Sequence, residues 1–161
     1  MRASTLAAPL FAATLATASP IANLPRAGAP SYVPITPPCS VSYPLSSSPS
    51  NATAAYAPAA ALTAAHKIYS WDRPLSDEAY VNATTLWSNC VEQCNGLDGC
   101  VSAFLAYNVP GESHYGGPAG NPSIGCRMYD VAVKESDFVG VANGTYERAV
   151  AGVIGGEGCQ N

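Results

Sequence analysis

The sequence predicts an α+β fold in which one helix packs across a small antiparallel β-sheet and disulfides join the elements. Three observations support this prediction. Apolar side chains recur with a helical period up to a Cys-x3-Cys pair, short β-rich segments surround that stretch, and six cysteines stand in a chain of 161 residues. One helix among several short strands is typical of an α+β domain.

The helix is expected between Asn82 and Gly96. Its apolar residues recur at intervals of three and four, which places them on one face and the polar residues on the other. Asn82 or Thr84 can act as the N-cap, and Asn95-Gly96 supplies a left-handed stop. The inward face comprises Ala83, Leu86, Trp87, Cys90 and Cys94, and the outward face comprises Thr85, Ser88, Asn89, Glu92 and Gln93.

Strands are expected on both sides of this helix. Residues 66–75 form a short β-rich segment that ends in an Asp-Arg-Pro turn, and residues 100–109 form a mostly buried strand. A further strand is predicted at residues 126–133, and shorter segments begin at Asp137 and at Thr145. These short strands would form the antiparallel sheet.

The first 60 residues are expected to lie outside the folded domain. Residues 1–18 contain one arginine, a short apolar segment and a small-x-small motif, which is the pattern of a secretory signal peptide. Residues 19–60 are rich in Pro, Ser and Ala, which favours an extended leader or linker without a long helix or central strand. Cys39 interrupts this leader and needs a partner, so we expect it to be tethered to a domain formed by residues 61–161.

The composition excludes a nucleic-acid binder and indicates an exported protein. Charged residues make up 11% of the chain, the net charge is −4, and the basic residues are scattered rather than clustered.

We expect no membrane anchor, because no segment after the signal peptide is long and apolar enough to cross a bilayer and no lipid-anchor signal ends the chain. Three Asn-x-Thr sequons, at Asn51, Asn82 and Asn143, predict surface glycosylation.

The six cysteines are expected to form disulfides rather than a metal or redox centre. A zinc site would need a second Cys-x2–4-Cys knuckle or added histidines, and a redox centre would need a Cys-x-x-Cys motif. The chain has neither, and export favours oxidised cysteines. We therefore expect no metal and no cofactor.

Six cysteines allow fifteen pairings, and their spacing alone does not choose among them. Cys90 and Cys94 lie one helical turn apart, with Cβ atoms about 5–6 Å apart, whereas a disulfide needs about 3.5–4.5 Å. Both must therefore pair outside the helix. Cys100 can fold back to Cys94 after the turn, and Cys126 opens a strand that can meet Cys90. The remaining pair, which would join the two ends, is Cys39 and Cys159.

This arrangement resembles the PAN/apple family of extracellular modules. A helix with Cys-x3-Cys, a third cysteine that leads into an apolar strand and a fourth cysteine in the next strand are all found in the stretch NCVEQCNGLDGCVSAFLAYN…GCRMYD. Cys39 and Cys159 resemble the terminal bridge of apple-type members. The segments AFLAYNVP, HYGGPAG and ESDFV are similar to those of small secreted proteins of filamentous fungi that contain this domain. The resemblance covers residues 69–159.

The resemblance implies a non-catalytic module that binds proteins or carbohydrates. We therefore expect a secreted recognition module, in the extracellular space or the cell wall, whose partner is an extracellular carbohydrate or protein. An alternative is a structural cell-wall or coat glycoprotein in which the Pro/Ser segment is a glycosylated spacer. A third possibility, a secreted hydrolase, has few candidate residues, because His66 and His114 are expected at the surface and no nucleophile elbow is present.

The candidate ligand-binding residues lie around the longest predicted loop, residues 110–125. A connection of this length is often functional. The loop contains Tyr115 beside His114 and near Asn108, and an exposed aromatic ring among amides suits a sugar, whose C–H groups stack on the ring. The alternative role for Tyr115 is to cover the edge of the sheet. Tyr129 alternates with the core-facing residues of its strand and is a second surface candidate.

Overall fold

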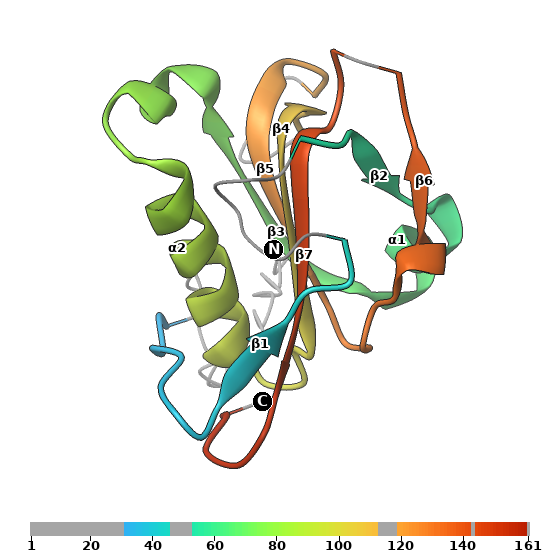
Figure 1. Cartoon of the computed structure of the whole chain (residues 1–161). Coiled ribbons are helices and arrows are strands. Elements are labelled where there is room, and N and C mark those ends of the chain that lie inside the picture. The colour runs from blue at the N-terminus through green and yellow to red at the C-terminus, as the bar shows by residue number, and fades with distance from the viewer. Residues whose placement is uncertain (1–30, 46–52, 113–118, 143, 161) are drawn as a thin grey trace, which may run out of the picture.

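The main element of the fold is a five-stranded antiparallel sheet with the strand order β1-β7-β4-β5-β3 (Figure 1). The computed structural model describes residues 31–45, 53–112, 119–142 and 144–160. The fold is α+β, as predicted, but it contains a second helix on the other side of this sheet and a second, two-stranded sheet, whereas one helix and one sheet were expected. The strands are β1 (Ser40–Ser42), β3 (Lys67–Pro74), β4 (Ser102–Pro110), β5 (Pro122–Tyr129) and β7 (Glu147–Gly155).

Helix α2 (Ala83–Asn95) crosses one face of the sheet (Figure 1). The predicted inward face is confirmed, because Leu86, Trp87 and both helix cysteines are buried in one cluster with side chains of β4, β5 and β7. The predicted outward face is wrong at one position. Gln93 is buried, at the end of the helix where Val33 packs and donates its N–H to the Glu92 carbonyl. A segment distant in sequence thus covers a polar part of the helix.

A smaller layer covers the opposite face of the sheet (Figure 1). It consists of helix α1 (Ala60–His66) and a two-stranded sheet of β2 (Tyr56–Pro58) and β6 (Phe138–Gly140). Phe104 and Ala151 of the central strands pack in this layer with Leu62 and Phe138. Strand β4 is therefore buried on both faces, which explains its continuous apolar sequence. Two short 3-10 helices, η2 (Leu75–Ala79) and η3 (Glu135–Asp137), complete the elements.

The Pro-rich segment forms part of this fold, which differs from the expectation of a leader over residues 19–60. Strand β1 pairs with β7 at the edge of the main sheet, and β2 pairs with β6. Both strands are three residues long, and neither is central, in keeping with the proline content. They dock through backbone hydrogen bonds, which leave no periodic signal in the sequence. The predicted signal peptide, residues 1–18, lies outside the described residues.

The predicted N-cap of α2 is confirmed, but the predicted stop at its C-terminal end is not. Asn82 is the N-cap, and its Oδ1 accepts the Thr85 N–H at 2.9 Å. The left-handed stop is wrong, because Gly96 has φ −94° and ψ 2°. Glycine is required there for another reason. A Cβ on residue 96 would overlap the backbone carbonyl of Ser31, which crosses the end of the helix.

The strands follow the predicted order, but several boundaries are wrong. Strand β5 begins at Pro122 and ends at Tyr129, four residues earlier at each end than predicted. Its pairing with β4 extends to Pro110 and Pro122, so the predicted loop 110–125 is shortened from both sides. Pro110 was expected to end the strand of residues 100–109 and Pro122 to lie within the loop, yet these two prolines form the last pair of the ladder. Proline is tolerated at a strand end because its missing N–H is not needed there.

All three predicted disulfides are present. Their pairs are Cys90–Cys126, Cys94–Cys100 and Cys39–Cys159. The first joins α2 to β5 within the core, the second closes the turn after α2, and the third joins the segment before β1 to the chain after β7. The four cysteines of the first two bridges are fully buried.

The contact between α2 and β7 requires a glycine at position 152. A Cβ there would lie 2.7 Å from Cζ2 of Trp87 and 2.6 Å from Cγ1 of Val41. We predict that Gly152→Ala lowers the free energy of unfolding by about 1–3 kcal/mol, because overpacking forces these side chains apart. Urea denaturation measures the change. Gly140→Ala is the matched control, since a Cβ there meets nothing within 4 Å. Equal stability of the two variants would contradict this packing.

Candidate functional site

A network of ion pairs fixes the base of the loop between β4 and β5. Its centre is Arg127 of β5, whose side chain is 6% exposed. The guanidinium Nη2 lies 2.9 Å from Oδ1 of Asp72, and Nε lies 3.0 Å from Oε1 of Glu112. Since Cys126 and Met128 point into the α2 cluster, alternation along the strand directs Arg127 to the other face of the sheet. A buried guanidinium requires such partners, so β3, β5 and the start of the loop are held together.

Glu112 is the loop residue of this network. Its backbone N–H and both of its carboxylate oxygens have hydrogen-bond partners. Its N–H donates to Oδ2 of Asp72 at 2.8 Å. Its carboxylate accepts hydrogen bonds from Lys67, at 2.6 Å, and from Ser70, at 2.8 Å. Burial opposes ionisation of Glu112, but the Lys67 and Ser70 hydrogen bonds and the charges of Arg127 and Lys67 outweigh it, so its pKa lies below the ordinary value.

A hollow of about 490 Å³ lies beside this network, between η2 and the two ends of the loop. We call it the loop-side hollow. The paired carboxylates form part of its wall, whereas Ser76 and Asn121 are exposed. Its prolines and Leu75 add apolar surface next to these polar groups. The lining residues are Asp72, Arg73, Pro74, Leu75, Ser76, Gly111, Glu112, Asn121, Pro122 and Ser123.

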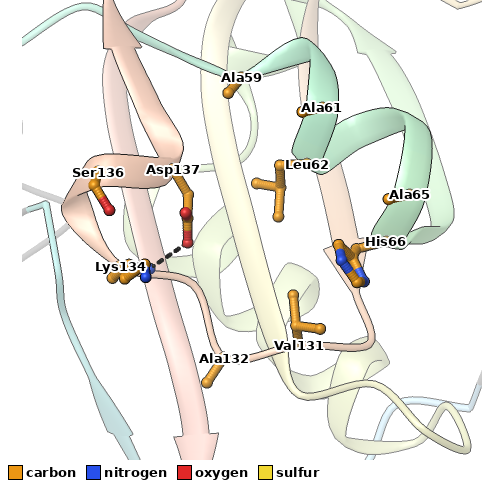
Figure 2. Close-up of a pocket in the computed structure, with 10 residues that line it drawn as sticks. All are labelled: Ala59, Ala61, Leu62, Ala65, His66, Val131, Ala132, Lys134, Ser136 and Asp137. Atoms are coloured by element: carbon orange, nitrogen blue, oxygen red, sulfur yellow. Dashed lines mark hydrogen bonds between the residues drawn. The ribbon is translucent and has the colours of Figure 1, made fainter.

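A second hollow, of about 540 Å³, lies between α1 and the chain that leads from β5 to β6 (Figure 2). We call it the α1 hollow. Leu62 and Val131 point into it, and alanines of α1 add to an apolar surface (Figure 2). Polar groups border it at two places, with His66 on one side and Lys134 and Asp137 on the other (Figure 2). The dashed bond joins the Lys134 N–H to Oδ2 of Asp137 at 2.9 Å.

His66 forms the one histidine–carboxylate pair of the described residues. Its Nδ1 lies 2.9 Å from Oδ1 of Asp130, and both side chains are more than 40% exposed. Figure 2 shows Ser136 across the α1 hollow from His66, so this serine is not placed as a nucleophile for the pair. Within the described part of the chain, no group of three His, Cys, Asp or Glu side chains could hold a metal ion.

Of the four predicted ligand-binding residues, the structure describes Asn108 and Tyr129. Tyr129 points away from Met128 as predicted, but its expected surface position is wrong. It is fully buried, because the α1 layer covers that face of the sheet, and burial raises its pKa. Asn108 is half-buried, with φ 53°, and its Nδ2 donates to Oε2 of Glu147 at 2.7 Å. His114 and Tyr115 lie outside the described residues.

Of the predicted glycosylation sites, the structure describes one. Asn82 is exposed at the start of α2, as a sequon requires. Asn51 and Asn143 lie outside the described residues.

The ion-pair network was not predicted from the sequence, although one signal of it was present. Arg127 stands in the predicted strand 126–133 between a cysteine and a methionine. A charge in such an apolar strand indicates a buried ion pair. Its partners are Asp72, in β3, and Glu112, in the loop after β4, and only the tertiary structure brings them to it.

Comparisons of the chain with protein-family models, with curated proteins and with solved structures found no match. No helix among the described residues is long and apolar enough to span a membrane. Three disulfides are typical of proteins that mature in an oxidising compartment.

The lowered pKa of Glu112 predicts an acid-dependent loss of stability. A carboxylate with a depressed folded-state pKa stabilises the fold above its unfolded pKa, about 4.3, and this contribution is lost as the pH falls through the folded-state value. Glu112→Gln should therefore lower the free energy of unfolding at pH 7 by about 1–2 kcal/mol, because the charge-assisted bonds are weakened. Between pH about 5 and 3, the free energy of unfolding should fall less in this variant than in the wild type.

Thermal unfolding followed by circular dichroism across this pH range measures the effect. Glu135→Gln, at an exposed carboxylate of η3, is the control for the removal of one negative charge. Parallel stability–pH curves for Glu112→Gln and the wild type would contradict the assignment of this acid sensitivity to Glu112.

Proposed function

We propose that this chain is a secreted, non-catalytic recognition module of the PAN/apple type that binds an extracellular carbohydrate or protein. The helix across an antiparallel sheet and the three disulfides are those that the resemblance implies, and they support this proposal. The disulfides also support export, because cysteine pairs persist in oxidising compartments.

The observation that supports a binding function best is the loop-side hollow with its fixed wall. Arg127 and Lys67 together neutralise the two carboxylates of that wall and hold them in place, so little order would have to be gained on binding. The exposed polar residues of the lining, Ser76 and Asn121, offer hydrogen bonds beside apolar surface. A sugar ring or a peptide turn presents the complementary mixture of hydroxyl or amide groups and C–H groups.

The loop that borders this hollow also contains His114 and Tyr115. A ring in this loop would add a stacking surface to the hydrogen-bonding groups of the hollow. We therefore place the proposed recognition surface at the loop-side hollow, and Tyr115, three residues after Glu112 in the sequence, is the loop residue to test with it.

Two observations favour recognition over the alternatives. Residues 31–45 and 53–60 of the Pro-rich segment are docked on the domain, so this part is poorly suited to be the spacer of a wall glycoprotein. The His66–Asp130 pair lies across the α1 hollow from Ser136, and both carboxylates of the loop-side hollow are engaged in ion pairs. Neither arrangement supplies the free acid, base or nucleophile of a hydrolase.

A binding screen of the secreted, oxidised protein against glycans and cell-wall polysaccharides tests the proposal. We expect saturable binding that Asn121→Ala and Tyr115→Ala each weaken by about tenfold, the value of one lost hydrogen bond or ring contact. Lys134→Ala, in the α1 hollow, is the matched control and should bind like the wild type.

The outcomes distinguish the parts of the proposal. Loss of binding in Lys134→Ala alone would move the site to the α1 hollow. Absence of binding to every polysaccharide would remove carbohydrate as the ligand class, and pull-down from extracellular extracts would then test protein partners. Turnover of any glycan that depends on His66 or His114 would contradict a non-catalytic role.

A further inference from the structure

Tyr80 is the most exposed large hydrophobic side chain of the described residues, at 88%. It lies in the turn between η2 and α2, where its own N–H donates to the Asp77 carbonyl at 3.0 Å. The next residue, Val81, donates its N–H to the same carbonyl and packs on the α2 cluster. The backbone is thus fixed on both sides of a tyrosine whose ring meets solvent. A single exposed ring is ordinary at a protein surface, but a neighbour of Tyr80 gives its exposure a role.

That neighbour is the sequon at Asn82, two residues after Tyr80. Tyr80 and Asn82 are both exposed, whereas Val81 between them is half-buried and packs on the α2 cluster. With Val81 directed inward, the tyrosine and the asparagine both reach solvent from the same short turn. Thr84, the third member of the sequon, is exposed as well.

The cap of α2 leaves the glycosylated atom of Asn82 available. Oδ1 of Asn82 accepts the Thr85 N–H at 2.9 Å and so orients the carboxamide. A glycan is attached to the other atom of the carboxamide, Nδ2. Attachment therefore preserves the N-cap, and the cap in turn fixes the direction in which the first sugar leaves the chain.

We propose that Asn82 is glycosylated and that the first N-acetylglucosamine packs on the ring of Tyr80. In the transfer, Nδ2 forms a bond to C1 of that sugar, the bond between C1 and the diphosphate of a lipid-linked oligosaccharide breaks, and Nδ2 gives up one proton. The ring then covers C–H groups of the sugar, which removes apolar surface of both partners from water. The inference rests on the export that the proposed function assumes.

The other two sequons lack this feature. The residue two positions before Asn51 is Pro49, and the residue two positions before Asn143 is Val141. Of the three sequons, that of Asn82 therefore has an aromatic residue two positions before the asparagine, and the other two do not. We expect the glycan at Asn82 to stabilise the start of α2, in addition to shielding the exposed ring.

The first test is the occupancy of Asn82 in the full chain secreted by a eukaryotic host. Enzymatic removal of N-glycans in heavy-oxygen water converts each occupied asparagine to labelled aspartate, which peptide mass spectrometry detects. We expect the label at Asn82. A chain that is secreted with Asn82 unmodified would overturn this inference alone, whereas a chain that never enters the medium would count against the proposed function.

The second test is a double-mutant cycle between the glycan and the ring. Thr84→Ala removes the sequon but retains Asn82 as the cap, and Tyr80→Ser removes the ring but retains the sequon. We expect Thr84→Ala to lower Tm by roughly 2–4 °C in the wild-type background and to have no effect in the Tyr80→Ser background. Thr84→Ser, which preserves the sequon, is the matched control. The same loss of Tm with and without Tyr80 would overturn the stacking.

Discussion

The bridge between Cys90 and Cys126 fixes α2 across the central sheet, and the remaining structure depends on this contact. It lies in a fully buried cluster where Trp87 packs over the bare backbone of Gly152. With Cys126 bound to the helix, alternation along β5 directs the next residue, Arg127, to the opposite face. There its guanidinium joins Asp72 and Glu112 at the base of the β4–β5 loop. One strand thus connects the stapled core to the candidate site.

The sequence predicted the features that local chemistry determines. The helix and its buried face follow from a 3.6-residue period, and its cap follows from the side chain of Asn82. The distance between Cys90 and Cys94 on one helix excluded a bond between them, and the turn after the helix, the next strand and the family resemblance indicated the three pairs. The features it did not predict come from layers that meet only in the folded chain. Tyr129 is buried because α1 lies over it, and Gln93 is buried where the N-terminal segment docks. Likewise, alternation identifies the face of a residue but not what covers that face.

The ion-pair network supports recognition as the proposed role of the site. Arg127 and Lys67 pair with the carboxylates of Asp72 and Glu112, so these carboxylates contribute shape and rigidity rather than a free base. Binding would then depend on neutral polar groups such as Asn121. The connection from β3 to α2 serves both proposals, since Leu75 and Ser76 of η2 line the loop-side hollow and Tyr80 and Asn82 follow directly.

Three specific disulfides fix the helix on the sheet, the turn after the helix, and the segment before β1 to the chain after β7. Mass spectrometry of peptides from the unreduced, secreted protein can detect these bridges. We expect the linked pairs Cys90–Cys126, Cys94–Cys100 and Cys39–Cys159 and no free thiol. A peptide in which Cys90 is joined to Cys94 or to Cys100 would contradict this pairing, because α2 would then have no covalent link to β5.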